Sequence, residues 1–147
     1  GYRFAHLANY EAKIAVKNML FFPLFKVDYR HIPWAIFSDP ELARVGLTEE
    51  QARRRYGDEV LVLRRYFKSV DKAQIRGETT GFCKILVLKS GEILGAHLVG
   101  AQASELIHAI ALAIQQRLKV REIANLTSIF PSLSEINTQT AAEWSQH

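Results

Sequence analysis

Apolar side chains recur in the first part of the chain at the spacing of a helix. The apolar positions between residues 7 and 20 include Ala8, Ala12, Ala15, Val16 and Met19. Pro23 closes the segment, because proline cannot continue a helix. We expect a helix over 7–20 with a slim alanine face. Such a face suits either close approach to a bulky group or an ordinary core contact.

Short apolar runs predict strands farther along the chain. They lie at 33–37, 43–47, 60–67, 82–88 and 93–99, and turn signals bound them. Asp39-Pro40 marks the first turn, since the residue before a proline avoids the helical region. Lys-Ser-Gly-Glu at 89–92 joins the last two runs, which form the clearest hairpin of the sequence.

Helical signals return after the second predicted strand. Thr48 and Gln51 have the spacing of a capping box, in which each side chain bonds the other residue's backbone. We therefore expect a helix over 48–56 that stops at Gly57.

The last third of the chain is predicted to be helical. A broad apolar face favours a long helix over 103–118, followed by a short one over 120–126. Phe130-Pro131 then interrupts the chain. Ser132 or Ser134 is expected to cap a final helix near the C-terminal end.

This order of elements predicts an α+β fold. Adjacent strands joined by tight turns favour an antiparallel β-sheet flanked by helices, which we place on one side. The length of 147 residues and the apolar content of 48% suit a compact unit with a real core. Nothing in the pattern indicates a βαβ nucleotide-binding unit.

The cysteine content and the hydropathy of the sequence limit the cellular location that we expect. Cys83 is the single cysteine of the sequence, so neither an intramolecular disulfide nor a dithiol pair can form within it. We expect a buried, inert thiol and a reducing, cytoplasmic location. No stretch has the length and apolarity of a membrane span, and the start at Gly1 reads as if another segment precedes it.

The formal net charge of +4 is compatible with a surface that binds nucleic acid. Positive charge clusters at 53–55 and 64–65. No aromatic residues interleave with the triple-arginine run as a stacking platform requires, so an ordinary basic surface is favoured. A free-standing basic module that recognises nucleic acid stays as the alternative function.

The sequence offers no catalytic constellation of its own. It contains no Gly-rich phosphate loop, no CxxC or HExxH pair and no GxSxG elbow. The five histidines are scattered, so we expect no metal site. A small independent enzyme is therefore disfavoured.

Four blocks of residues, in order, resemble a known family. Residues 32–49, IPWAIFSDPELARVGLTE, are similar to the signature that opens the C-terminal dimerisation domain of dihydrolipoamide dehydrogenases, mercuric reductases and glutathione reductases. The runs GFCKILV, ILGAHLVG with the following ASELI, and PSLSE resemble later blocks of the same domain. The sequence Ala-Ala-Glu-Trp at 141–144 is most similar to mercuric-reductase-like members.

The resemblance implies a fragment of a larger flavoenzyme. Residues 1–30 would be the end of a linker helix from the FAD domain, and residues 31–147 the dimerisation domain. FAD, NAD(P)H and the redox cysteines would belong to upstream domains, and the parent would be a homodimer. The helix start at His6, Leu7 and Ala8 would approach the flavin, where the positive end of a helix dipole favours negative charge. The fragment would not be catalytic alone.

One position departs from the family pattern. The family's closing motif carries an acid/base histidine and, five residues later, a glutamate that orients it. This chain has Phe130 at the histidine position and retains Glu135. Three interpretations follow: different chemistry, mercuric-reductase-like or quinone-directed; a proton from another residue or from the substrate; or a weak catalyst. Glu135 is then either a catalytic residue or a first-turn carboxylate that the helix dipole favours.

Overall fold

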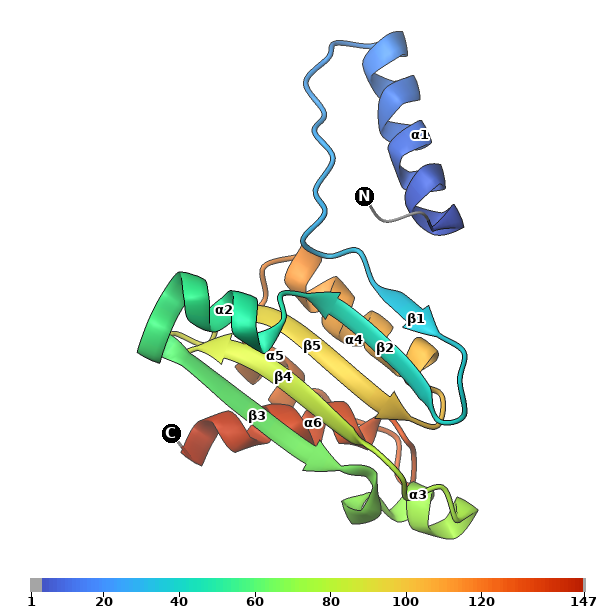
Figure 1. The fold of residues 1–147 in the computed structure, drawn as a ribbon, viewed down its shortest axis with the longest axis vertical. Helices are drawn as coiled ribbons and strands as arrows, with labels where there is room; N and C mark the ends of the chain where they lie inside the picture. Colours follow the sequence, from blue (N-terminus) through green and yellow to red (C-terminus); the bar gives the residue numbers. More distant parts are fainter. Residues whose placement is uncertain (1–3, 147) are drawn as a thin grey trace.

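The computed structural model of the chain describes residues 4–146 (Figure 1). Residues 1–3 of the predicted linker segment 1–30, and His147, lie outside the described residues. The helices are α1 (Ala5–Leu20), α2 (Glu49–Tyr56), α3 (Asp71–Arg76), α4 (Ala103–Gln115), α5 (Val120–Ala124) and α6 (Glu135–Ala142). The strands are β1 (Trp34–Ile36), β2 (Glu41–Gly46), β3 (Val60–Tyr66), β4 (Phe82–Leu88) and β5 (Ile93–Gly100).

The five strands form one antiparallel sheet in the order β1-β2-β5-β4-β3. The predicted hairpin is confirmed as β4–β5, and the α+β class is confirmed with it. Strand β2 pairs with β5 although about 50 residues separate them. This non-local pairing joins β1 and β2 to the other three strands. Gly46 and Gly95 are paired there. Position 46 requires glycine, because a Cβ would collide with the Leu94 carbonyl.

The helices do not all lie on one side of the sheet, as the sequence led us to expect. Helices α4, α5 and α6 cover one face and share the main core with Leu63, Ile85 and Leu98 (Figure 1). Helix α2 packs on the opposite face, where Ala52 meets a smaller cluster that includes Leu86. The capping box begins α2 directly after β2, and the helix then covers one end of that face.

Several element bounds differ from prediction for local reasons. Helix α4 ends at Gln115, short of 118, because Arg117 adopts the left-handed conformation with φ 55°. Helix α3 was not predicted; it follows β3 and ends at Gly77, whose φ of 69° suits a helix end. The capping box of Thr48 and Gln51 is present as predicted.

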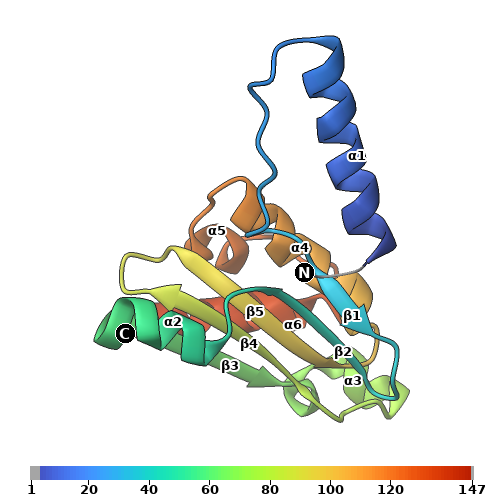
Figure 2. The same ribbon diagram turned by 45° about the horizontal axis from the view of Figure 1, so that its top comes forward.

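Helix α1 projects away from the sheet, and Figures 1 and 2 show this from two directions. Within this fully described helix Leu7 is the only buried residue, and the predicted alanine face is largely exposed. The segment after it also exposes Phe21, Phe22 and Leu24. The fold of residues 34–142 thus has its own core, whereas α1 leaves most of its apolar side chains exposed.

Candidate functional site

The segment before α6 carries the predicted catalytic Glu135. Its side chain turns back on the chain, and Oε1 accepts a hydrogen bond of 2.7 Å from the backbone N–H of Ser132. The predicted serine cap is therefore wrong, because Ser134 makes no capping bond and its hydroxyl lies 2.8 Å from that of Ser132. Leu133 is buried and anchors the turn in the core. The carboxylate satisfies a backbone donor, which is a structural task.

Phe130 lies on the exposed side of this segment. Its peptide bond to Pro131 is cis, and its side chain is 70% exposed, next to Ile129 at 81%. In the part of the chain that the structure describes, no hydrogen bond or ion pair joins a histidine to Glu135. The segment presents apolar surface and supplies no proton donor at the position where the family motif has one.

A buried polar contact supports the segment from behind. Asn137 is buried; its Nδ2 donates to the Leu106 carbonyl at 2.9 Å, and its Oδ1 lies 3.8 Å from the Cys83 sulfur. The expected burial of Cys83 is confirmed. That burial raises the pKa of the Cys83 thiol to about 12, which disfavours the reactive thiolate. Sequence reasoning missed Asn137, since a single amide in a helix carries no signal of the strand that it meets.

His6, Leu7 and Ala8 form the start of α1, the second predicted site. The His6 Nε2 lies 2.7 Å from the Pro33 carbonyl, and the Phe4 ring stacks between His6 and Trp34. Leu7 is buried and Ala8 is exposed. The first turn of α1 holds no acidic residue and no capping side chain. Among residues 4–146, the positive end of the helix dipole thus has no acidic side chain in the first turn to offset it.

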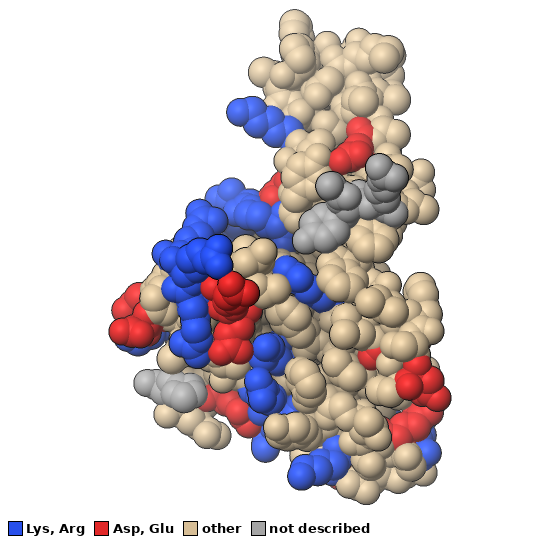
Figure 3. All heavy atoms as spheres, viewed as in Figure 1, with Lys and Arg blue, Asp and Glu red and all other residues tan. Residues whose placement is uncertain are grey.

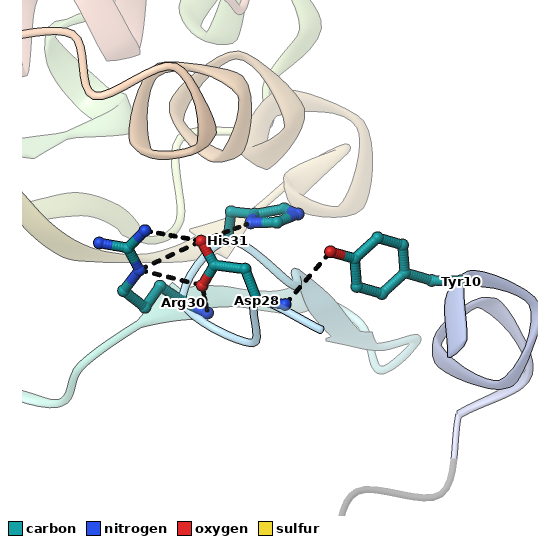
Figure 4. A network of polar contacts seen from close by, with 4 residues as sticks. All are labelled: Tyr10, Asp28, Arg30 and His31. Carbon is teal, nitrogen blue, oxygen red and sulfur yellow. Dashed lines mark hydrogen bonds and ion pairs between the residues drawn. The ribbon is translucent and has the colours of Figure 1, made fainter. Parts of the chain in front are cut away.

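Polar contacts tether α1 to the segment that leads into the sheet (Figure 4). The Asp28 N–H donates to the Tyr10 hydroxyl at 3.2 Å, and the Asp28 carboxylate binds the Arg30 guanidinium at 2.7 Å. The Arg30 hydrogen bonds hold the pKa of Asp28 well below its usual range. His31 completes the network 3.8 Å from Asp28. These contacts orient α1 with little apolar burial.

The two predicted sites do not meet within one chain. The start of α1 contacts the edge of the sheet at Pro33 and Trp34, whereas Glu135 begins α6 beneath β3 and β4. Among the described residues, no hydrogen bond or ion pair joins Glu135 to His6. A joint role would require a second subunit.

The sheet face opposite α4, α5 and α6 carries basic side chains. Arg44, His97, Lys84 and Arg64 are direct cross-strand neighbours on β2, β5, β4 and β3. Figure 3 views this face and shows Lys and Arg gathered over the sheet and around α2. Burial, followed by Lys84 and Arg44, lowers the pKa of His97 to about 4. His97 is thus a neutral spacer between cations near neutral pH.

The basic surface does not indicate a nucleic-acid site. Arg53 and Arg54 pair with Glu49 and Glu50 one helical turn away, at 3.1 and 2.7 Å. The run of three arginines is therefore a partly neutralised helix face. In the described residues no group of three or more His, Cys, Asp or Glu is placed to hold a metal ion. No described helix has the length and apolarity needed to cross a membrane.

Comparison with known proteins identifies relatives along almost the whole chain. A dihydrolipoyl dehydrogenase of Synechocystis sp. is 42% identical over 136 residues, which are 90% of this chain and 28% of the relative. A mercuric reductase of Staphylococcus aureus is 32% identical over 136 residues, or 92% of this chain and 25% of the relative. The chain thus spans less than a third of these relatives. The mercuric-reductase likeness is shared with dihydrolipoyl dehydrogenases of higher identity.

A solved structure shares the fold of this chain. The crystal structure of LpdA from Mycobacterium tuberculosis superposes with a TM-score of 0.88 at 28% identity, over 97% of this chain and 31% of that one. Residues 32–141 match the family described as pyridine nucleotide-disulphide oxidoreductase, dimerisation domain. This chain therefore belongs to the dimerisation-domain family of the pyridine nucleotide-disulphide oxidoreductases.

Proposed function

We propose that the chain is the interface domain of an FAD-dependent, NAD(P)H-linked homodimeric oxidoreductase and has no activity by itself. The family match over residues 32–141, in a chain that spans under a third of its relatives, carries the proposal. We place the boundary between a linker helix at 1–30 and the interface domain at 31–147. The isolated core of residues 34–142 and the weakly buried α1 support that division.

The start of α1 is proposed to face the flavin of the parent enzyme. The absence of a side-chain cap and of an acidic residue in its first turn suits a cofactor that gains negative charge. When bound, FAD would supply the electron transfer. The Pro33 carbonyl holds the His6 ring at the sheet edge, and Leu7 is buried. The backbone of His6, Leu7 and Ala8 and the small, exposed Ala8 side chain would then face the cofactor.

The reaction of the parent is proposed not to draw a proton from residues 130–135. Phe130 cannot transfer one, and Glu135 is engaged with the Ser132 N–H. Mercuric-reductase-like or quinone-directed chemistry, or a proton from elsewhere, fits this segment better than the dithiol chemistry of a His-Glu pair. The proposed setting is the cytoplasm.

Sequencing the reading frame upstream of Gly1 in the parent gene tests this assignment. We expect a dinucleotide fingerprint, GxGxxG after a strand, and a Cys-x4-Cys pair. An upstream frame without either would refute the proposal. The alternative of a nucleic-acid module receives no support from the family match.

Exposed apolar side chains support self-association. Leu112 on α4 is 56% exposed, and Leu126, Ile129 and Phe130 are exposed on the segment that follows α5. An obligate dimer interface of roughly 2,000 Å² or more would cover such a surface. We expect two copies to meet through α4 and the 126–130 segment.

Sedimentation velocity of the 147-residue chain tests the dimer. Leu112→Glu should shift the protein to monomer, because a buried charge opposes association. Ile75→Glu is the control: Ile75 is also an exposed apolar residue, at 68%, but lies on α3, outside this surface. Equal loss of the dimer in both variants would contradict this interface. A dimer that persists in Leu112→Glu would contradict it as well.

A further inference from the structure

A cavity of about 720 Å³ lies at the end of the sheet where α2 and the end of α4 approach the 29–30 segment. Five cationic side chains line it: Arg30, Arg44, Arg55, Arg117 and Lys119. Glu92 is the only acidic residue among the lining residues. The cavity is separate from Phe130, Glu135 and the start of α1.

Most of this positive charge is not neutralised by the protein. Arg30 pairs with Asp28. Within residues 4–146, the other four cations make no ion pair within 4.0 Å. Arg44 donates to the Gly46 carbonyl at 3.2 Å and to Gln51 at 3.3 Å, and its guanidinium lies 5.8 Å from the centroid of the Trp34 ring. Its Nε is buried without a hydrogen-bond partner among the described residues. Clustered cations repel each other, so a negative ligand would lower the energy of the folded state.

The backbone at the end of α4 holds two of the cations in place. The Leu118 N–H bonds the Ala113 carbonyl at 2.8 Å and the Arg117 N–H bonds that of Ile114 at 3.1 Å, which is a Schellman helix end. The left-handed position of that motif usually holds glycine, but here it holds Arg117, with φ 55°. The backbone of Lys119 is positioned by a β-bridge to Glu92.

The wall of the cavity also has an apolar part, formed by Leu47, Leu94 and Ile114. The cavity volume lies within the range of small-molecule sites, about 300–1,000 Å³. Guanidinium groups favour phosphate because they donate paired hydrogen bonds to its oxygens. We propose that this cavity binds a phosphorylated small molecule of nucleotide size, with the phosphates on Arg55, Arg117 and Lys119 and the remainder on the apolar wall.

Calorimetric titration of the 147-residue chain at low salt tests this site, with ADP, pyrophosphate and adenosine as probes. We expect ADP to bind with Kd below about 1 mM and adenosine not to bind. Arg55→Gln and Arg117→Gly should each weaken ADP binding by about fivefold or more, since each removes a charge-assisted contact. Arg117→Gly should keep the fold, because glycine suits the left-handed position. Glu92→Gln should strengthen binding, because it removes the opposing charge.

Arg54→Gln is the matched control, because Arg54 neighbours Arg55 but points to Glu50 outside the cavity. It should change the ADP affinity by less than about twofold. The proposal is overturned if neither ADP nor pyrophosphate binds at about 5 mM. It is also overturned if adenosine binds as well as ADP, or if Arg54→Gln weakens binding as much as Arg55→Gln. Equal melting temperatures would show that the variants are folded.

Discussion

At the scale of single residues, the 130–135 segment combines an exposed aromatic ring with a carboxylate that has a structural role. Phe130 exposes an apolar ring where the family motif has its acid/base, and Glu135 accepts the Ser132 N–H. A carboxylate in the first turn of a helix is favoured there whether or not it takes part in catalysis. Retention of Glu135 therefore does not require a catalytic partner.

Substitutions at Glu135 separate these roles. Glu135→Gln keeps an oxygen acceptor for the Ser132 N–H and should cost less than about 0.5 kcal/mol of unfolding free energy. Glu135→Ala removes the acceptor and should cost about 1 kcal/mol. Urea denaturation measures both values. A similar large loss in both variants would instead indicate that the charge of Glu135 is the stabilising feature.

Cys83 should make stability fall at alkaline pH. Its folded-state pKa of about 12 lies above that of an exposed thiol, so the contribution is complete below the unfolded pKa and is lost as pH rises towards 12. Each pH unit in that window costs at most about 1.4 kcal/mol. Thermal unfolding from pH 8 to pH 11 should show a steeper decline for wild type than for Cys83→Ala. Parallel declines would contradict a buried thiol.

At the scale of elements, the sheet divides its two faces between packing and charge. One face packs on α4, α5 and α6, whereas the other carries Arg44, His97, Lys84 and Arg64 in one cross-strand row. A neutral His97 between two cations limits repulsion in the row. Glu49 of α2 pairs with Lys84 at 3.2 Å and couples the helix to that face.

Acid should destabilise the sheet through His97. Its folded pKa of about 4 lies below the unfolded value, so its contribution is present above the unfolded pKa and is lost as pH falls towards 4. The stability advantage of wild type over His97→Gln should therefore shrink between pH 7 and pH 4.5. His108→Gln, at an exposed site on α4, is the control and should leave the slope unchanged. An unchanged slope in His97→Gln would exclude this role.

The cap of α2 gives a second element-scale prediction. The Thr48 hydroxyl accepts from the Gln51 N–H at 3.1 Å, and Gln51 accepts from the Thr48 N–H at 3.0 Å. Thr48→Ala should lower the unfolding free energy by about 1 kcal/mol, measured in urea. Thr48→Ser keeps the hydroxyl and should recover most of the loss. Failure of serine to do so would mean that the methyl group, and not the cap, is what matters.

At the scale of the whole molecule, the compact core and the projecting α1 differ in what holds them. The core closes through the non-local β2–β5 pairing and two apolar clusters. Helix α1 relies on polar tethers, including the paired bonds between the Asn18 side chain and the Phe25 backbone at 2.8 and 3.0 Å. Exposed polar contacts contribute little to stability, so α1 should open before the core does.

Limited trypsin digestion tests this order. Cleavage after Lys26 should precede any cut within residues 34–142, and Asn18→Ala should accelerate it by removing both tethers. Asn9→Ala on the exposed surface of the same helix is the control and should leave the rate unchanged. Simultaneous loss of α1 and the core would show instead that they unfold as one unit.

The local features of this protein could be predicted from the order of its residues. The capping box at Thr48 and Gln51, the β4–β5 hairpin and the family blocks depend on neighbouring residues, so local spacing was enough to predict them. The substitution at Phe130 was equally visible, because a motif is a local pattern.

Only the tertiary structure decided which distant residues meet. Placement of α2 on the second face, the burial of Asn137 against β4 and the shared cavity of Arg55 and Arg117 depend on strand order and helix packing. Local spacing carries no information about such contacts, because loop closure brings together residues that are far apart in sequence. The left-handed Arg117 belongs to the same class, since a non-glycine residue there gives no local signal.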